Sequence, residues 1–183
     1  MNKLLKIAQL GNPILRLEAQ PVSQITDDRL SELIDSLIAT AANANGVGIA
    51  APQVSQSYRL FIIASRPSER YPHAPKMQPT AMINPYIVSH SEEIIKDWEG
   101  CLSVPGIRGL VPRYKQIEVE YTTREGKLEH KILTDFVARI FQHELDHLDG
   151  KVFLDRLESE QDMYTEAEYQ SIINEQLSMN NYQ

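Results

Sequence analysis

The chain has 183 residues, of which 42% are hydrophobic and 23% charged, and its formal net charge is −7. This composition suits one soluble domain with a sizeable core and excludes an intrinsically disordered chain. The negative charge gives no electrostatic reason to expect nucleic acid as the main ligand. No stretch approaches the roughly 18 apolar residues that span a membrane, and the first residues do not read as a secretory signal. We therefore expect a cytoplasmic protein that does not associate with membranes.

The excess negative charge lies at the end of the chain. Six of the 25 acidic residues follow Arg156 without any lysine or arginine, whereas the preceding part is nearly neutral. We predict one domain over residues 1–157 and an acidic tail over 158–183. A helix is expected to begin in this tail at Thr165, with Glu168 completing a capping box.

Residues 26–46 predict an amphipathic helix. The apolar residues of TDDRLSELIDSLIATAANANG recur at the i, i+3, i+4, i+7 spacing that places them on one buried face. Thr26 can cap the start of this helix, and Gly46 can end it.

The next segment, GVGIAAPQ at 46–53, has almost no side-chain bulk. Another chain or a ligand can therefore approach its backbone closely, and the amide of Gln53 can donate a hydrogen bond. The simpler interpretation is a helix end followed by a packed turn.

The middle of the chain predicts strands and loops. A strand, a proline-rich loop and a second strand are expected in turn at 58–65, 66–80 and 81–88. Pro85 in the second strand indicates a sheet edge or a bulge. Two alternating segments, 115–123 and 127–133, flank the triplet REG and predict a β-hairpin. Strands followed by a late helix favour an α+β fold over regularly alternating parallel units.

That late helix, TDFVARIFQHELDHLDG at 134–150, combines a wide apolar face with two histidines. His143 and His147 are four residues apart, so both imidazoles can point at one place. Glu144 leans to the side and can reach a metal-activated water without ligating the metal. This is the H-E-x-x-H pattern of metal-dependent hydrolases. The alternative is an ordinary helix with chance histidines, but burying these polar groups without partners would be costly.

A catalytic metal needs a third protein ligand and an open position for water. No histidine follows the helix, and the acidic tail is expected to be solvated, which disfavours a metallopeptidase that takes its third ligand downstream. Upstream, EGCLS at 99–103 contains Cys101, the only cysteine of the chain. Its thiolate suits a soft or borderline divalent ion. Considered alone, Cys101 is better interpreted as a small buried hydrophobic residue. Considered together with the two histidines of the helix, it becomes a stronger candidate for the third metal ligand.

A non-catalytic domain with a structural metal or a peptide-binding role is a further alternative. A closed structural site needs a fourth protein ligand, and there is no second cysteine. The remaining histidines fall in segments that read as loop or strand surface, and they are His73, His90 and His130.

GVGIAAPQ, EGCLS and QHELDHLDG, in this order, resemble the three signature motifs of the peptide deformylases. The similarity extends from LGNPILR at 10–16 to VFLDRL at 152–157. It implies a single-domain α+β fold in which antiparallel strands pack around a central metal-binding helix. It also implies hydrolytic removal of the formyl group from the N-terminal formyl-methionine of new polypeptides, with release of formate. One divalent ion, commonly Fe²⁺, is implied as cofactor, although the ligand types suit Zn²⁺ equally.

The resemblance assigns roles to individual residues of this chain. The implied metal ligands are Cys101, His143 and His147. The implied catalytic groups are Glu144 as general acid–base, with Gln53 and the backbone N–H of Leu102 stabilising the oxyanion. The peptide backbone is expected to bind in an extended pose at Val47, Gly48 and Gly100. The methionine pocket is expected to be lined by Val47, Phe136 and Ile140.

Three further features go beyond the motifs. Arg139, one turn before His143, is expected either to line or cap the pocket or to be solvated. Arg108 and Arg113 can meet a peptide substrate or form surface salt bridges. The tail carries no bases, so we expect it neither to bind nucleic acid directly nor to be needed for catalysis.

Overall fold

The computed structural model describes residues 3–68 and 71–180. This part of the chain contains two antiparallel sheets and three α-helices. The larger sheet has the order β1-β2-β3-β6-β7, with β1 (Gly48–Ala50), β2 (Leu60–Ile63), β3 (Thr80–His90), β6 (Gln116–Thr122) and β7 (Leu128–Thr134). The smaller sheet has the order β4-β5-β8, with β4 (Ile94–Cys101), β5 (Val104–Tyr114) and β8 (Met163–Thr165). This confirms the predicted α+β class.

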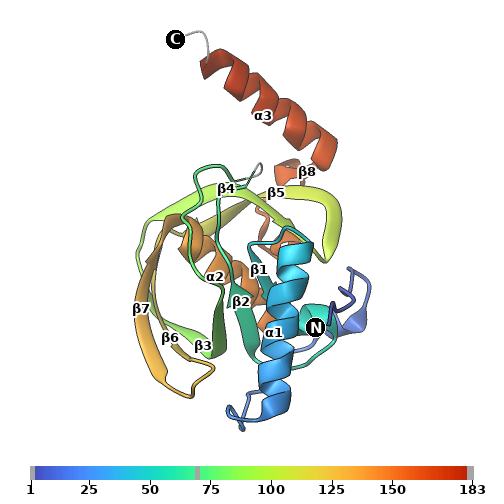
Figure 1. The fold of residues 1–183 in the computed structure, drawn as a ribbon. Coiled ribbons are helices and arrows are strands. Elements are labelled where there is room, and N and C mark those ends of the chain that lie inside the picture. Colours follow the sequence, from blue (N-terminus) through green and yellow to red (C-terminus); the bar gives the residue numbers. More distant parts are fainter. Residues whose placement is uncertain (1–2, 69–70, 181–183) are drawn as a thin grey trace.

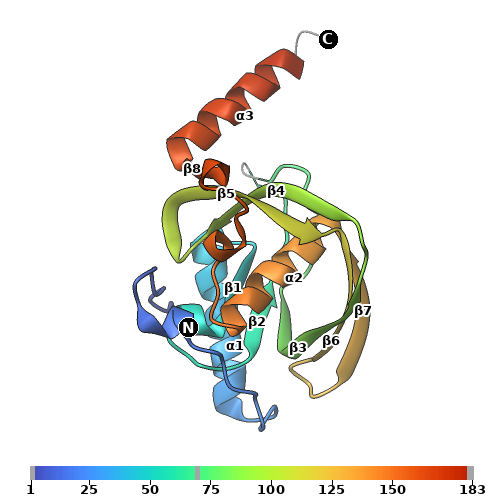
Figure 2. The ribbon, with the colours of Figure 1, turned by 180° about the vertical axis from the view of Figure 1, so that it is seen from behind.

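Helix α2 (Asp135–Leu148) lies between the two sheets and contacts strands of both (Figures 1 and 2). Its apolar face is buried in a core with β2, where Phe61 and Phe141 meet edge to face at 5.1 Å between ring centroids. Burying an aromatic or leucine side chain contributes about 1.5–3 kcal/mol, so this core holds the helix firmly. The predicted helix at 134–150 is confirmed, and the histidines are carried by a rigid element.

Helix α1 (Asp28–Asn43) packs on β1 and β2. The predicted helix is confirmed, but both predicted end residues were wrong. Asp27, and not Thr26, is the N-cap: its carboxylate accepts a hydrogen bond from the backbone N–H of Arg29 at 2.8 Å. After the helix, Asn45 takes the left-handed conformation with φ 52°, as asparagine readily does, so Gly46 is not needed there.

The predicted strands and hairpin of the larger sheet are present. Strands β6 and β7 form the hairpin expected around REG, and Gly126 adopts φ 80° in its turn. Pro85 lies where the β3–β6 register shifts between Ile83 and Tyr86. Because β2 pairs with β3 only over Thr80–Ile83, Pro85 lies at a bulge in the part of β3 that pairs with β6 alone, as the prediction of an edge or a bulge allows.

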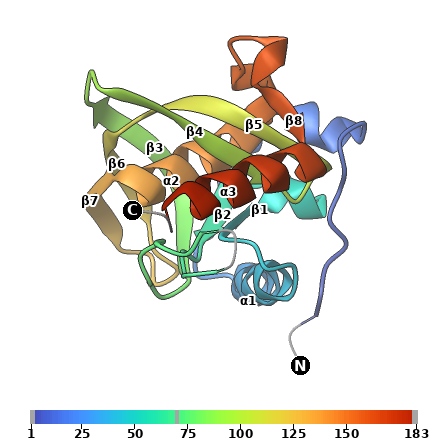
Figure 3. The same cartoon turned by 90° about the horizontal axis from the view of Figure 1, so that it is seen from above.

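The hairpin of β4 and β5 was not predicted from the sequence, and neither was β8. Strand β8 pairs with β5 at Ile107, Arg108 and Gly109, which attaches the tail to the smaller sheet. Helix α3 (Glu166–Asn180) follows β8 and extends away from the body of the molecule (Figures 1 and 2), so that it lies in front of the body in the view from above (Figure 3). None of the helices in the described ranges is long and apolar enough to cross a membrane.

The start of α3 is fixed in place. The predicted capping box is confirmed: the N–H of Thr165 donates to Glu168 Oε2 at 2.7 Å, and the N–H of Glu168 donates to Thr165 Oγ1 at 3.2 Å. Tyr169 is buried against Trp98, with 4.9 Å between ring centroids. The first turns of α3 therefore belong to the folded body.

Candidate metal centre

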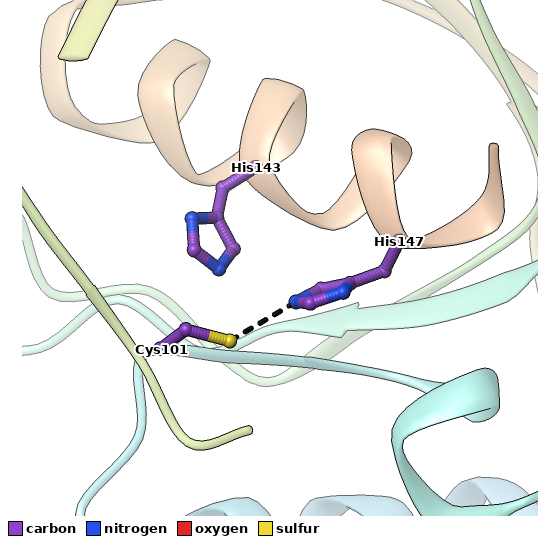
Figure 4. Close-up of side chains that lie close together, drawn as sticks. All are labelled: Cys101, His143 and His147. Carbon is purple, nitrogen blue, oxygen red and sulfur yellow. Dashed lines mark hydrogen bonds between the residues drawn. The ribbon is translucent and has the colours of Figure 1, made fainter. Parts of the chain in front are cut away.

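The ligand atoms of Cys101, His143 and His147 lie within 4.8 Å of one another. Cys101 Sγ is 3.2 Å from His147 Nε2, and Figure 4 shows both imidazoles of α2 turned toward the sulfur at the end of β4. Among the described residues, this is the one group of three His, Cys, Asp or Glu side chains with such spacing. The tertiary structure thus brings together the helix pair and the thiol that the sequence separates.

The chemistry of these donors fits a divalent ion. The partial burial of Cys101 opposes ionisation of its thiol, but His147 and His143 lower the pKa of this thiol to about 5. A thiolate is the form that ligates metals. Three other histidines are exposed and do not belong to this group: His73 in a loop, His90 on β3 and His130 on β7. Three protein ligands leave a position open, as in catalytic sites.

Glu144 is buried beside the ligands, with 4% of its surface exposed. Its Oε2 has no hydrogen-bond partner among the described residues, and burial raises the pKa of Glu144 to about 7. An unpaired buried carboxyl is costly and typical of functional sites. Such a carboxyl can take up and return a proton near neutral pH.

Position 48 has no room for a side chain, because Glu144 packs against the backbone of Gly48. A Cβ atom at Gly48 would lie 2.3 Å from Glu144 Oε1. Strand β1 is also the edge of the larger sheet, since only β2 pairs with it. The glycine therefore makes room for the carboxylate and leaves a strand edge that an extended peptide can join.

The amide of Gln53 is held in a fixed orientation. Its Oε1 accepts a hydrogen bond from the backbone N–H of Ala50 at 2.8 Å, so its NH₂ group faces the smaller sheet. This NH₂ group donates to Ser103 Oγ at 3.1 Å and lies 3.5 Å from Cys101 Sγ. Leu102, with Ser103, forms the turn that joins β4 and β5. Both predicted oxyanion donors are thus beside the candidate metal ligands.

A buried ion cluster supports His143 from behind. Glu99 accepts two hydrogen bonds from Arg113, at 2.8 and 3.0 Å, and one from Arg139 at 2.9 Å. Its Oε2 is 2.8 Å from His143 Nδ1, which directs the other ring nitrogen to the metal site. Burial opposes the ionisation of Glu99, but Arg113 and His143 hold its pKa well below the usual range.

The two arginines of this cluster are neither solvated nor in surface salt bridges. Arg139 lies in the pocket wall and is 6% exposed, and its guanidinium also donates to the Val111 carbonyl at 2.8 Å. Arg113 also binds Asp146 at 2.7 Å. Sequence reasoning missed Glu99 and Asp146, although each is adjacent to a motif residue that it did select.

A pocket of about 260 Å³ opens onto the centre. Its lining includes the predicted ligands and catalytic groups Gln53, Cys101, Leu102, His143 and Glu144. It also includes the predicted peptide-binding residues Val47, Gly48, Gly100, Phe136 and Ile140. His147 contributes from beneath the pocket, where it is 1% exposed.

The acidic tail reaches this pocket. Glu166, in the first turn of α3, lines it and accepts a hydrogen bond from Arg108 Nε at 2.8 Å. Asp162 is 9% exposed and binds Lys96 at 2.8 Å. The expectation of a solvated tail was therefore wrong for Asp162 and Glu166, because the pairing of β8 with β5 draws them onto the smaller sheet, whereas Glu158 and Glu160 are exposed as expected.

Comparison with known proteins gives one family. The model of the family described as polypeptide deformylase matches residues 4–163. The chain is 67% identical over 171 residues to peptide deformylase 2 of Nostoc sp., covering 93% of this chain and 96% of that protein. It is 50% identical to peptide deformylase 2 of Shewanella oneidensis, covering 85% of each.

Solved structures agree with the sequence relatives. A class I type b peptide deformylase from Acinetobacter baumannii with bound Met-Ala-Ser superposes with a TM-score of 0.84 at 46% identity, covering 86% of this chain and all of that one. The peptide deformylase of Thermotoga maritima gives 0.77 at 36% identity, covering 86% and 99%. This chain therefore belongs to the peptide deformylase family, the metal-dependent hydrolases that remove the N-terminal formyl group from newly made polypeptides.

Proposed function

We propose that Cys101, His143 and His147 hold one divalent ion, Fe²⁺ in the cell, and that this centre deformylates N-formyl-methionyl peptides. The observation that carries the proposal is the convergence of the only thiol with the two histidines of α2, all within 4.8 Å. When bound, the ion supplies Lewis-acid activation of water and of the formyl carbonyl. Iron follows from the family resemblance, since the ligand types suit zinc as well.

Glu144 is the proposed proton carrier. Its buried, unpaired Oε2 accepts the proton of the attacking water and then delivers it to the nitrogen of the leaving amine. The products are formate and a peptide with a free N-terminus. A carboxyl whose pKa is raised to about 7 suits both steps at neutral pH.

Gln53 and Leu102 are the proposed oxyanion donors. The side-chain NH₂ of Gln53, oriented by Ala50, and the backbone N–H of Leu102 donate to the oxygen of the attacked formyl carbon. Because the donors are fixed before the charge develops, removing one costs typically ~100- to 1000-fold in rate.

The peptide is proposed to bind as an added strand on the open edge of β1. Val47, Gly48 and Gly100 contribute backbone groups, and Val47, Phe136 and Ile140 enclose the methionine side chain. The Met-Ala-Ser peptide bound by the related Acinetobacter baumannii enzyme supports a ligand of this kind.

The proposed location is the cytoplasm, with catalysis in residues 1–157 and an accessory role for residues 158–183. The tail, whose described helix carries acids and no bases, is proposed not to bind nucleic acid directly. Co-sedimentation with ribosomes at low and high salt tests this, and salt-dependent binding that is lost on removing the tail contradicts it.

The decisive experiment for the centre is metal analysis of protein purified without oxygen, before and after the change Cys101→Ala. We expect one equivalent of iron in the parent protein and a large loss in the variant. Full occupancy in the variant would remove Cys101 from the site.

The substrate is tested with formyl-Met-Ala-Ser, its acetyl analogue and an unmodified protein. We expect rapid release of formate from the first and little reaction with the others. Efficient cleavage of internal amides would favour a metallopeptidase instead.

A further inference from the structure

We propose that Tyr71 limits the length of the side chain on the formylated residue, because its ring separates the methionine pocket from a second cavity. The inference deepens the proposed function and rests on it. It concerns the end wall of the pocket and not the reacting atoms.

A second cavity of about 280 Å³ adjoins the pocket at the metal centre. The two share three aromatic lining residues, Tyr71, Trp98 and Phe136. The second cavity continues between the loop after Tyr71, strand β4 and helix α3. Its other lining residues are Pro72, His73, Ala74, Asp97, Tyr169 and Ile173. Most of the lining is apolar or aromatic, so the cavity suits an alkyl chain.

Two of the shared rings form the boundary between the cavities. The ring centroids of Tyr71 and Phe136 are 4.7 Å apart, and the ring planes are tilted by 44°. Rings at this distance are in van der Waals contact, so no alkyl chain passes between them. The third shared residue, Trp98, packs instead on Tyr164 and Tyr169, with 4.9 Å between centroids in each pair.

Tyr71 is held in place by its backbone and by its phenol. Its N–H donates to the Ser68 carbonyl and its carbonyl accepts from the Ser68 N–H, each at 3.1 Å. The same carbonyl accepts from the Ala74 N–H at 3.1 Å. The phenol oxygen accepts a hydrogen bond from Arg108 at 3.4 Å. The ring is therefore a fixed part of the wall.

The contact with Phe136 places this wall at the end of the methionine pocket. In the proposed function, Phe136 encloses the methionine side chain together with Val47 and Ile140. A side chain much longer than methionine must then displace the ring of Tyr71. Without that ring, the chain extends into the second cavity.

The experiment compares formyl-Met-Ala-Ser with a matched peptide whose first residue carries an octyl side chain in place of that of methionine. The ratio of kcat/KM, octyl peptide over methionine peptide, does not depend on the fraction of active enzyme. The parent protein should prefer the methionine peptide. Tyr71→Ala should raise the ratio at least about tenfold, the discrimination typical of a single methylene in an apolar pocket.

Three variants show whether the ring itself is responsible. Tyr71→Phe keeps the ring and loses only the hydroxyl that Arg108 contacts, so its ratio should stay near that of the parent protein. Tyr58→Ala removes a 43% exposed tyrosine that lines neither cavity and should leave the ratio unchanged. In Tyr71→Ala/Ile173→Trp the added bulk fills the second cavity and should reverse the gain, which a merely loosened loop would not explain.

An unchanged ratio in Tyr71→Ala overturns the inference. So does an equal rise in Tyr71→Phe or Tyr58→Ala, or a gain that Ile173→Trp does not reduce. Equal kcat/KM of the parent protein for the two peptides also overturns it, because no wall then limits the side chain. Failure of the parent protein to release formate from formyl-Met-Ala-Ser contradicts the proposed function instead.

Discussion

At the residue scale, Glu144 is the group whose burial is least explained by packing. Glu144→Gln keeps the shape of the side chain but cannot accept a proton, so turnover should fall by at least about 100-fold, as for loss of a general base. The fold and the metal content should be retained, because the side chain is not a proposed ligand. Formate release and metal content, measured on the same preparation, check this. Activity within a few-fold of the parent protein would rule out the proposed role.

Gly48 offers an independent test of the same carboxylate. In Gly48→Ala the new methyl group would approach Glu144 Oε1 to 2.3 Å and must displace it. We expect turnover to fall by about tenfold or more, since small misplacements of catalytic groups are costly. The double variant Gly48→Ala/Glu144→Gln should be no slower than Glu144→Gln alone. Additive losses would mean that Gly48 acts separately from Glu144.

Glu99 links the stability of the protein to its metal site. Glu99→Gln leaves the guanidiniums of Arg113 and Arg139 with a neutral partner, and breaking a buried pair typically costs about 3–5 kcal/mol of unfolding free energy. His143 also loses its charged acceptor at Nδ1, so metal affinity should fall ~10- to 100-fold. Denaturant unfolding and metal titration measure the two effects.

The control for this prediction is the double variant Glu99→Gln/Arg139→Met. It removes Arg139, which pairs with Glu99, whereas Arg113 keeps its ion pair with Asp146, so the double variant should recover part of the lost stability. The single variant Arg139→Met completes the cycle. If the losses of unfolding free energy in the two single variants add up in the double variant, the two residues act independently.

At the element scale, the tail divides into a docked part and a projecting part. Truncation after Leu157 removes β8, which pairs with β5, and Glu166, which binds Arg108. Truncation after Ile173 leaves these contacts and removes a segment in which Glu175, Gln176 and Met179 are exposed. We expect the variant truncated after Ile173 to match the parent protein. The variant truncated after Leu157 should have a higher KM and a lower melting temperature.

Formate release across a range of substrate concentrations, with thermal unfolding, distinguishes the two truncations. This replaces the sequence-based expectation that everything beyond Arg156 is dispensable. If the variant truncated after Leu157 behaves like the parent protein, that expectation is restored, and the contacts of β8 and Glu166 with β5 are not needed for activity.

The strands of the smaller sheet were not predicted, because their sequences lack the usual strand patterns. Strand β5 contains two prolines and two glycines, residues that are depleted in strands. Pro112 is tolerated because β8 pairs with β5 only over Ile107–Gly109, which leaves the outer edge beside Pro112 without a partner strand in the described chain. Strand β4 has no clear alternation, since most of its side chains are at least partly exposed.

At the scale of the whole molecule, the proposed metal ligands join α2 to β4, and so join the core helix to the smaller sheet. An ion that binds only the folded state at 100 times its dissociation constant adds about 2.7 kcal/mol of stability. Removing the metal with a chelator should therefore lower the melting temperature by several degrees while leaving the far-ultraviolet circular dichroism intact. Thermal unfolding of the metal-free and reconstituted protein checks this, with Cys101→Ala as a control that should show no such shift.

The sequence alone determined the features that depend on short-range geometry. The pairing of His143 with His147 follows from the helical repeat, and the amphipathic face of α1 and the capping box at Thr165 follow from local spacing. The order of three short motifs identified the family and so the expected ligands. These inferences needed no knowledge of which strands pair.

Only the tertiary structure determined what depends on contacts distant in sequence. It showed that Arg139 and Arg113 form ion pairs with Glu99. It also showed that Glu144 occupies the space that a side chain at position 48 would need. It also brought Glu166 to the pocket through the pairing of β8 with β5. The physical reason is that strand register and the burial of charged groups are fixed by the whole fold, whereas the spacing of residues on a helix is set by the backbone itself.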